Sequence, residues 1–174
     1  METKDSIYSR RSIRKYKNTI IDENILIEAI KAGTKAPSAH NYQPWKFKIL
    51  SIKEKDIIAD ELINKTKDIQ ESTGPHTAEI IKNCPNSIMI YYDDNNENRD
   101  LNIISIGACI ENIILYLNDL GYGTLWVGNT NDIKEEIIKI TNVNAEPISM
   151  ILVGEKDQDP HERPRKELED IIIK

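Results

Sequence analysis

The longest apolar pattern in the chain lies between residues 101 and 128. From Ile103 to Leu117, isoleucine and leucine recur at spacings of three and four residues and cover more than one face of a helix. A helix that is apolar nearly all round belongs in the middle of a domain. Gly121 stands where a left-handed residue would end the helix, and Thr124 to Val127 has the pattern of a buried strand. The sequence therefore predicts a central helix that leads into a core strand.

Shorter patterns predict the elements around this core. Further helices are expected at residues 6–9, 22–33, 53–73 and 132–140, and further strands at 46–50, 87–92 and 148–153. Residues 93–98 form an acidic, asparagine-rich run, which is typical of a mobile loop. Helices interleaved with few strands indicate a sheet covered by helices on both faces.

Composition narrows the class of protein. With 174 residues, 39% of them hydrophobic, the chain is expected to form one domain over residues 1–174. The first residues are charged and no uninterrupted apolar run approaches the roughly 18 to 20 residues of a membrane span, so a cytoplasmic protein without membrane contact is predicted. Cys84 and Cys109 lack the spacing of a redox or zinc pair and are predicted to be core thiols. The three histidines lie too far apart for a local metal motif, so no metal site is predicted.

Charge is distributed unevenly along the chain. The net charge is -6, yet residues 1–17 hold six cations and two acids, and a second basic run follows at 160–166. Arginine offers a planar fork of donors that suits phosphate oxygens, and a neighbouring serine adds a donor. An exposed basic surface or a nucleic-acid patch is the alternative, but the acidic remainder of the chain disfavours nucleic acid as a partner.

The stretch from Ala36 to Trp45 is rich in turn-forming residues and amides. Asn and Gln side chains present a donor and an acceptor together, which matches the mixed edge of a pyrimidine-like ring. Asparagines that only form turns are the structural alternative.

Several catalytic constellations are absent from the sequence. It has no Gly-x-Ser-x-Gly elbow, no phosphate-binding loop ending in Lys-Ser or Lys-Thr, and no Rossmann glycine fingerprint. A protein with arginines, amides and no evident nucleophile can still be an enzyme if a cofactor carries the reaction.

Four short motifs, taken in their order and separation, carry a resemblance. They are Arg10 to Tyr16, Ala36-Pro37-Ser38 with Asn41 to Trp45, the central helix with Gly121 to Gly128, and Arg163-Pro164-Arg165. Together they resemble the FMN-dependent nitroreductase and flavin reductase family over nearly the whole chain.

The resemblance implies a fold and an activity. The expected fold is of the α+β class: a nitroreductase-like three-layer α/β/α sandwich with a mixed sheet covered by helices, completed by dimerisation. FMN is expected at the subunit interface of a homodimer. The expected activity is the passage of electrons from NAD(P)H to nitroaromatic, quinone or similar flat acceptors in two half-reactions, a ping-pong mechanism. The apolar central helix and the tail Ile171-Ile172-Ile173, which lacks an evident local partner, suit such a dimer.

The resemblance also implies roles for particular residues. Arg14 is expected near the N1 and C2 carbonyl edge of the flavin, where a fixed cation favours the reduced anion, so it is the expected catalytic residue. A backbone N–H near Gly128 or Asn129 is expected at N5, and Arg11 either joins the site or faces solvent. The remaining cofactor-binding residues fall into three groups. Arg10, Ser12, Arg163 and Arg165 are expected to hold the phosphate and ribityl chain, and Leu125, Trp126 and Gly128 to lie along the ring. Ser38 and Asn41 are expected to reach across from the partner to the ribityl chain and ring, with Gln43 as a supporting amide and Pro37 in the same loop.

The chain departs from the family pattern in places. Ala39 and His40 stand where many members carry hydroxyl residues, and no residue is assigned to the mid-chain contact that some relatives make to the pyrimidine edge. The physiological acceptor and the choice between NADH and NADPH remain open. Two other functions also remain: an FMN enzyme of the same fold that performs reductive dehalogenation or dehydrogenation, and a flavin carrier or sensor without turnover.

Overall fold

A four-stranded antiparallel sheet forms the middle layer of the structure, a computed structural model that describes residues 2–93 and 98–173. The strands are β1 (Trp45–Ile49), β2 (Asn86–Tyr92), β3 (Gly123–Val127) and β4 (Glu146–Gly154), in the order β1-β2-β4-β3. The central strands β2 and β4 are almost wholly buried, and β3 lies at one edge.

The expectation of a mixed sheet is wrong for these four strands. Each neighbouring pair is antiparallel, and the parallel pairing among described residues is the isolated bridge between Ser12 and Thr124. The cause is the position of β4. Strands β2 and β3 run the same way, but β4 inserts between them and is antiparallel to both.

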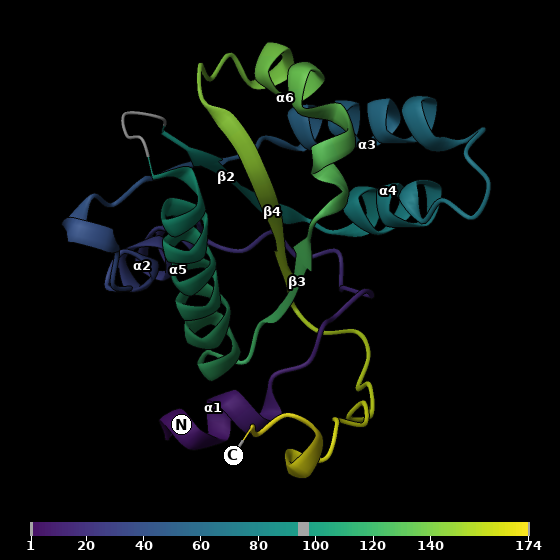
Figure 1. Cartoon of the computed structure of the whole chain (residues 1–174). Coiled ribbons are helices and arrows are strands. Elements are labelled where there is room, and N and C mark those ends of the chain that lie inside the picture. Colours follow the sequence, from purple (N-terminus) through teal and green to yellow (C-terminus); the bar gives the residue numbers. More distant parts are fainter. Residues whose placement is uncertain (1, 94–97, 174) are drawn as a thin grey trace.

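Helices cover both faces of the sheet, so the expected three layers are confirmed (Figure 1). Side chains alternate along each strand: Met89 and Tyr91 of β2 belong to one apolar cluster, and Ile88, Ile90 and Tyr92 to the other. The first cluster packs under α3 (Ile52–Thr66), α4 (Gly74–Asn83) and α6 (Lys134–Thr141). The second packs under α2 (Glu23–Gly33) and α5 (Arg99–Asp119).

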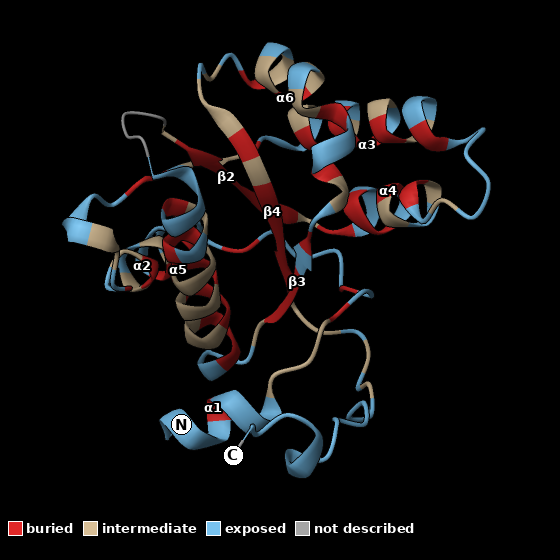
Figure 2. Ribbon diagram, viewed as in Figure 1, coloured by how far each residue is buried: buried red, intermediate tan, exposed pale blue. Residues whose placement is uncertain are grey.

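The central helix α5 is buried on one side only, which corrects the expectation of burial all round. Leu101 is 49% exposed and Ile104 69% exposed, whereas Ile106, Ile110 and Ile113 are buried against the sheet (Figure 2). By length and composition alone α5 could cross a membrane, yet 44% of its most apolar window is buried inside this fold. The helix ends as predicted, because Gly121 adopts a left-handed backbone conformation with φ +90°.

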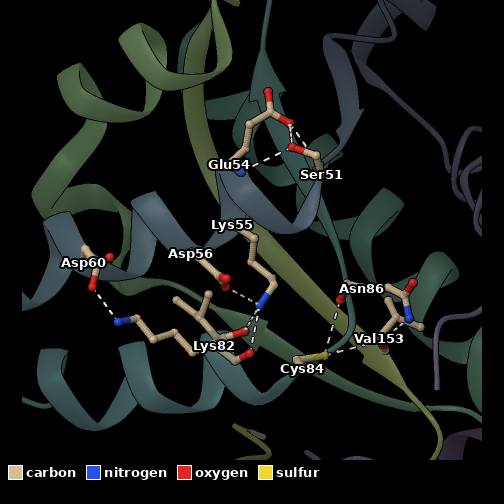
Figure 3. A network of polar contacts seen from close by, with 10 residues as sticks. Ser51, Glu54, Lys55, Asp56, Asp60, Lys82, Cys84, Asn86 and Val153 are labelled. Carbon is tan, nitrogen blue, oxygen red and sulfur yellow. Dashed lines mark hydrogen bonds and ion pairs between the residues drawn. The ribbon is translucent and has the colours of Figure 1, made fainter. Parts of the chain in front are cut away.

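Helix α4 is missing from the sequence-based expectation, which treats residues 73–75 only as a break. Pro75 instead starts the helix, since proline needs no N–H partner in the first turn. The far end of α4 is held by Lys55 of α3, a buried lysine on a helix expected to be solvated (Figure 3). Its Nζ donates to the carbonyl oxygens of Ile81 (2.8 Å) and Lys82 (3.0 Å) and to Asp56 (2.9 Å).

Other expectations hold. Cys84 and Cys109 are buried free thiols, and burial raises the pKa of both to about 12. The loop expected at 93–98 falls largely on residues 94–97, which lie outside the described residues.

The two ends of the chain run side by side (Figure 1). Helix α1 (Thr3–Ser9) is bound to α5, where the Ser6 hydroxyl donates to the Leu115 carbonyl oxygen over 2.9 Å. The chain then follows β3, where Ile13 N donates to Thr124 O over 2.9 Å. After β4 the C-terminal segment, which includes the 3-10 turn η3 (Leu168–Asp170), returns past α1 with its side chains exposed (Figure 2).

Candidate functional site

The two basic stretches of the sequence meet at one cavity. Its volume is about 300 Å³, and it combines residues that follow α1 with residues of the C-terminal segment. All six basic-end residues predicted to bind the cofactor line it: Arg10, Arg11, Ser12, Arg14, Arg163 and Arg165. Pro160, His161 and Glu162 complete the wall.

The arginines differ in how their charges are compensated. Arg11 donates to the carbonyl oxygens of Tyr8 (2.7 Å) and Arg10 (2.9 Å) and to Glu162 (3.2 Å). Arg10 lies 3.8 Å from a Glu111 carboxylate oxygen on α5. Within residues 2–93 and 98–173, the guanidinium groups of Arg14, Arg163 and Arg165 form no ion pair, so the cavity keeps a surplus of positive charge that suits an anion.

A second cavity, of about 460 Å³, adjoins the first because Arg14 and Arg163 line both. Its other walls come from the end of β3 and the start of α4. They are Leu125, Trp126, Val127, Gly128 and Asn129 on one side, and Thr73, His76, Thr77 and Ile80 on the other. The three ring-binding residues predicted from the sequence, Leu125, Trp126 and Gly128, therefore lie together beside Arg14.

The outer edge of β3 is open next to this cavity. Thr124 O points outward to Ile13 N, and Val127 O points inward to the Ser149 hydroxyl over 2.8 Å. Because N–H and C=O of one residue leave a strand on the same side and successive residues alternate, the backbone groups of Trp126 also face outward. A side chain added at Gly128 would meet no atom within 4 Å, so this backbone is open to close approach.

The structure does not bring the loop from residue 36 to 45 to these cavities. None of Pro37, Ser38, Asn41 and Gln43 is among the described residues that line either one. The loop lies instead beside the first half of α5, where Ala39 N donates to Ser105 Oγ over 3.3 Å. Its backbone is constrained, because His40, Asn41 and Gln43 have φ of 49°, 59° and 51°, values that non-glycine residues adopt rarely.

An exposed apolar stripe on α5 connects the loop to the cationic cavity. Leu101 and Ile104 are exposed and one turn apart, the half-buried Ala108 follows on the same face, and Glu111 lies beside Arg10. Trp126 is 44% exposed and reaches the stripe from β3, because a methyl group added at Gly107 would lie 3.8 Å from its indole.

Sequence reasoning missed the α4 side of the second cavity. The sequence gives no role to Thr73, His76 and Thr77, because the helix that carries them was not expected. Asn129 was expected to contribute only its backbone. Asn129 Nδ2 donates to Thr73 Oγ1 over 2.9 Å and links the two walls. The available signal was Pro75 followed by apolar residues at helical spacing, which marks a helix start.

Comparison with known proteins places these features in a family. The sequence model of the Nitroreductase family matches residues 7–155. A protein of Methanothermobacter thermautotrophicus, provisionally named an NADH dehydrogenase/NAD(P)H nitroreductase, is 27% identical over 173 residues, which cover 94% of this chain and 82% of that one.

Solved structures show the same fold. A provisionally named nitroreductase from Desulfovibrio desulfuricans, solved in complex with FMN, superposes with a TM-score of 0.84 at 21% identity, covering 100% of this chain and 96% of that one. A nitroreductase family protein from Streptococcus pneumoniae gives a TM-score of 0.84 at 19% identity, with coverage of 99% and 100%. The α+β class and the family resemblance of the sequence are both confirmed: the chain belongs to the nitroreductase family of oxidoreductases.

Proposed function

We propose that residues 1–174 form one FMN-binding domain of a cytoplasmic homodimer that passes electrons from NAD(P)H to nitroaromatic, quinone or similar flat acceptors by a ping-pong mechanism. One observation carries the proposal: a cavity with unpaired guanidinium groups adjoins the open edge of β3. The family match and the FMN complex of a structural neighbour support the choice of cofactor.

The residues present fit FMN in the chemistry of their donors. Arg10, Ser12, Arg163 and Arg165 offer charge-assisted hydrogen bonds to a phosphate, with Arg11 partly engaged by Glu162. Leu125, Trp126 and Gly128 offer an apolar wall and open backbone to a flat ring. When bound, FMN supplies the two-electron chemistry, so the protein contributes binding, orientation and charge.

Arg14 is the residue that we assign to charge stabilisation. It lines both cavities, is exposed, and makes only a long 3.3 Å bond to the Ser12 carbonyl oxygen. A cation held beside the atoms on which negative charge accumulates favours the charged state without reorganising at the moment of reaction.

The homodimer supplies the rest of the site. A two-fold contact pairs the same surface of both subunits, and the α5 stripe has the loop near Ser105 at one end and the cationic cavity near Glu111 at the other. These positions are six residues apart, or about 9 Å along a helix. If the two stripes pack antiparallel, Pro37, Ser38, Asn41 and Gln43 of one subunit lie beside the cavity of its partner.

The first experiment is an absorption spectrum of the purified protein, followed by steady-state NAD(P)H oxidation with an added quinone. We expect flavin bands and parallel double-reciprocal plots, as two separate half-reactions require. Absence of flavin binding after incubation with FMN would contradict the cofactor assignment. Bound flavin without turnover would favour a carrier or sensor, and turnover limited to halogenated or saturated substrates would favour the dehalogenase or dehydrogenase alternative.

A further inference from the structure

Among the described residues that line the second cavity, His76 is the one whose side-chain type commonly serves as a general acid or base. The cavity's described titratable residues are Arg14, Arg163 and His76, and an arginine stays protonated in proteins. Thr73, Thr77 and Asn129 donate hydrogen bonds but do not ionise in this range. Histidine is the side chain that exchanges its proton between about pH 5 and 8.

His76 is held on a rigid element while its ring stays in reach of solvent. It lies in the first turn of α4, directly after Pro75, and is exposed. Lys55 fixes the far end of α4, and the bond between Asn129 and Thr73 fixes the near end against the turn after β3. The same cavity, whose volume is about 460 Å³, includes the strand end assigned to the flavin ring and has an apolar wall of Ile80, Leu125 and Val127 that suits a flat acceptor.

We propose that His76 is the general acid that protonates the acceptor in the second half-reaction. This inference rests on the proposed function. Reduction of a quinone to a hydroquinone takes two electrons and two protons. FMN, when bound and reduced, would supply both electrons and one proton as a hydride equivalent, and the His76 side chain would donate the second proton to a quinone oxygen. The neutral imidazole then takes a proton from water, to which it is exposed.

Among the described residues, two cations line the cavity with His76, and further charged residues lie on α4 itself and on the elements near it. Arg14 and Arg163 share its cavity, Glu79 follows one turn later on α4, and Asp132 lies on the turn after β3. At the end of α3, Lys65 pairs with Glu136 of α6 over 3.9 Å. No carboxylate is among the described residues that line the cavity.

The test compares two acceptors in rapid-mixing reoxidation of the reduced holoenzyme. A quinone needs protons, whereas ferricyanide takes electrons one at a time and needs none. In His76→Gln the limiting rate with saturating quinone should fall by about a hundredfold, the usual contribution of a general acid, while the ferricyanide rate stays within about twofold of wild type. Glu79→Gln, on the same helix outside the cavity, should match wild type with both acceptors.

Binding supplies a readout that is independent of turnover. The FMN affinity of the His76→Gln apoprotein should be unchanged, and hydroquinone added to the oxidised protein should shift the His76 imidazole Hε1 resonance. Three results would contradict the assignment of His76 as general acid. The limiting rate with quinone could be unchanged, the rate with ferricyanide could fall equally, or only the quinone concentration needed for half the maximal rate could rise. If the wild-type protein neither binds FMN nor oxidises NAD(P)H, the proposed function itself is wrong. That result comes from the wild-type protein alone and is therefore distinct from a failure of the His76 proposal.

Discussion

Arg10 and Arg165 come from opposite ends of the chain to the same cavity, which makes them the sharpest test of phosphate binding. A hydrogen bond to a charged group contributes roughly 1.5 to 3 kcal/mol. Replacing either arginine by alanine should therefore weaken FMN by about ten- to a hundredfold, measured by fluorescence titration of the apoprotein. Thermal denaturation should be close to that of wild type, because both side chains reach solvent.

Arg11 provides the matched control. Its guanidinium is engaged by two carbonyl oxygens and by Glu162, so fewer of its donors remain for a ligand. Arg11→Ala should cost less FMN affinity than either Arg10→Ala or Arg165→Ala. If all three variants bind FMN as tightly as the wild type does, the phosphate does not bind in this cavity.

Arg14 should affect the redox potential more than binding. Arg14→Gln removes an unpaired cation that lines both cavities, so the reduced, negatively charged state loses stabilisation. The midpoint potential of bound flavin should fall, and reduction by NAD(P)H should slow. Potentiometry that finds no downward shift would leave Arg14 with a structural role only.

At the scale of elements, two glycines distinguish the stability of the fold from the binding of the cofactor: Gly123 begins β3, and Gly128 directly follows it. A Cβ at Gly123 would lie 2.9 Å from three atoms of the branched Ile13 side chain, whereas a Cβ at Gly128 would meet nothing within 4 Å. Gly123→Ala should destabilise the protein by about 1 to 3 kcal/mol through overpacking. Gly128→Ala should leave urea denaturation unchanged yet weaken FMN, and wild-type affinity in this variant would argue against a ring along this strand end.

Glu146, at the start of β4, ties together the starts of three elements. Arg99 of α5 donates to it over 2.8 and 3.3 Å and Lys134 of α6 over 2.6 Å, and the bonds from Arg99 hold its pKa below the usual 4.5. A carboxylate with a lowered folded-state pKa stabilises the fold above its unfolded pKa and loses this as pH falls through the folded value.

Glu146→Gln should therefore lower the free energy of unfolding at pH 7. The side chain is 30% exposed, so solvent screening keeps the loss at about 0.5 to 1 kcal/mol. Urea denaturation of both proteins at several pH values should show the gap closing below pH 4.5. If the difference in the free energy of unfolding between the two proteins is unchanged at pH 3, it comes from packing and not from the charge of Glu146.

Periodicity was enough to predict most elements but not their pairing. The apolar patterns that predict a strand at 148–153 and a helix that ends at Gly121 reflect which residues are buried, and the sheet and α5 bury them. The insertion of β4 between β2 and β3 leaves no local trace, because β2 and β4 are buried along almost their whole length and their apolar pattern does not record which strand lies beside which. Helix α4 was missed because Gly74-Pro75 reads as a break, although proline also starts helices.

The part of the candidate site that lies in recognisable sequence motifs was predictable. Arg10, Arg14 and Arg163 could be grouped by residue type and by resemblance, and they line connected cavities. His76 could not be grouped with them, because its approach to Arg14 depends on the packing of α4 against the turn after β3. That contact joins residues 73 and 129, which share no pattern in the chain.

At the scale of the whole molecule, the exposed stripe of α5 should be a subunit interface. Ile104 is 69% exposed at its centre, so Ile104→Asp should leave the subunit folded but place a charge in the contact. We expect circular dichroism like that of wild type, with a smaller mass by light scattering. A dimer of wild-type stability would move the interface away from α5.

The C-terminal tail should support the same dimer and the same cofactor site. Leu168, Ile171 and Ile172 are more than half exposed and Ile173 is 99% exposed, although soluble chains rarely leave such a run of apolar side chains without a partner. The tail begins just after Arg165, so an interface that covers it would be continuous with the cationic cavity and large enough, at about 2,000 Å² or more, for an obligate dimer. Removing residues 168–174 keeps every arginine of the cavity, and therefore tests the interface and not the phosphate contacts. Light scattering and flavin absorbance should show the dimer and the FMN lost together, and a truncated monomer that still holds FMN stoichiometrically would show that one subunit encloses the site alone.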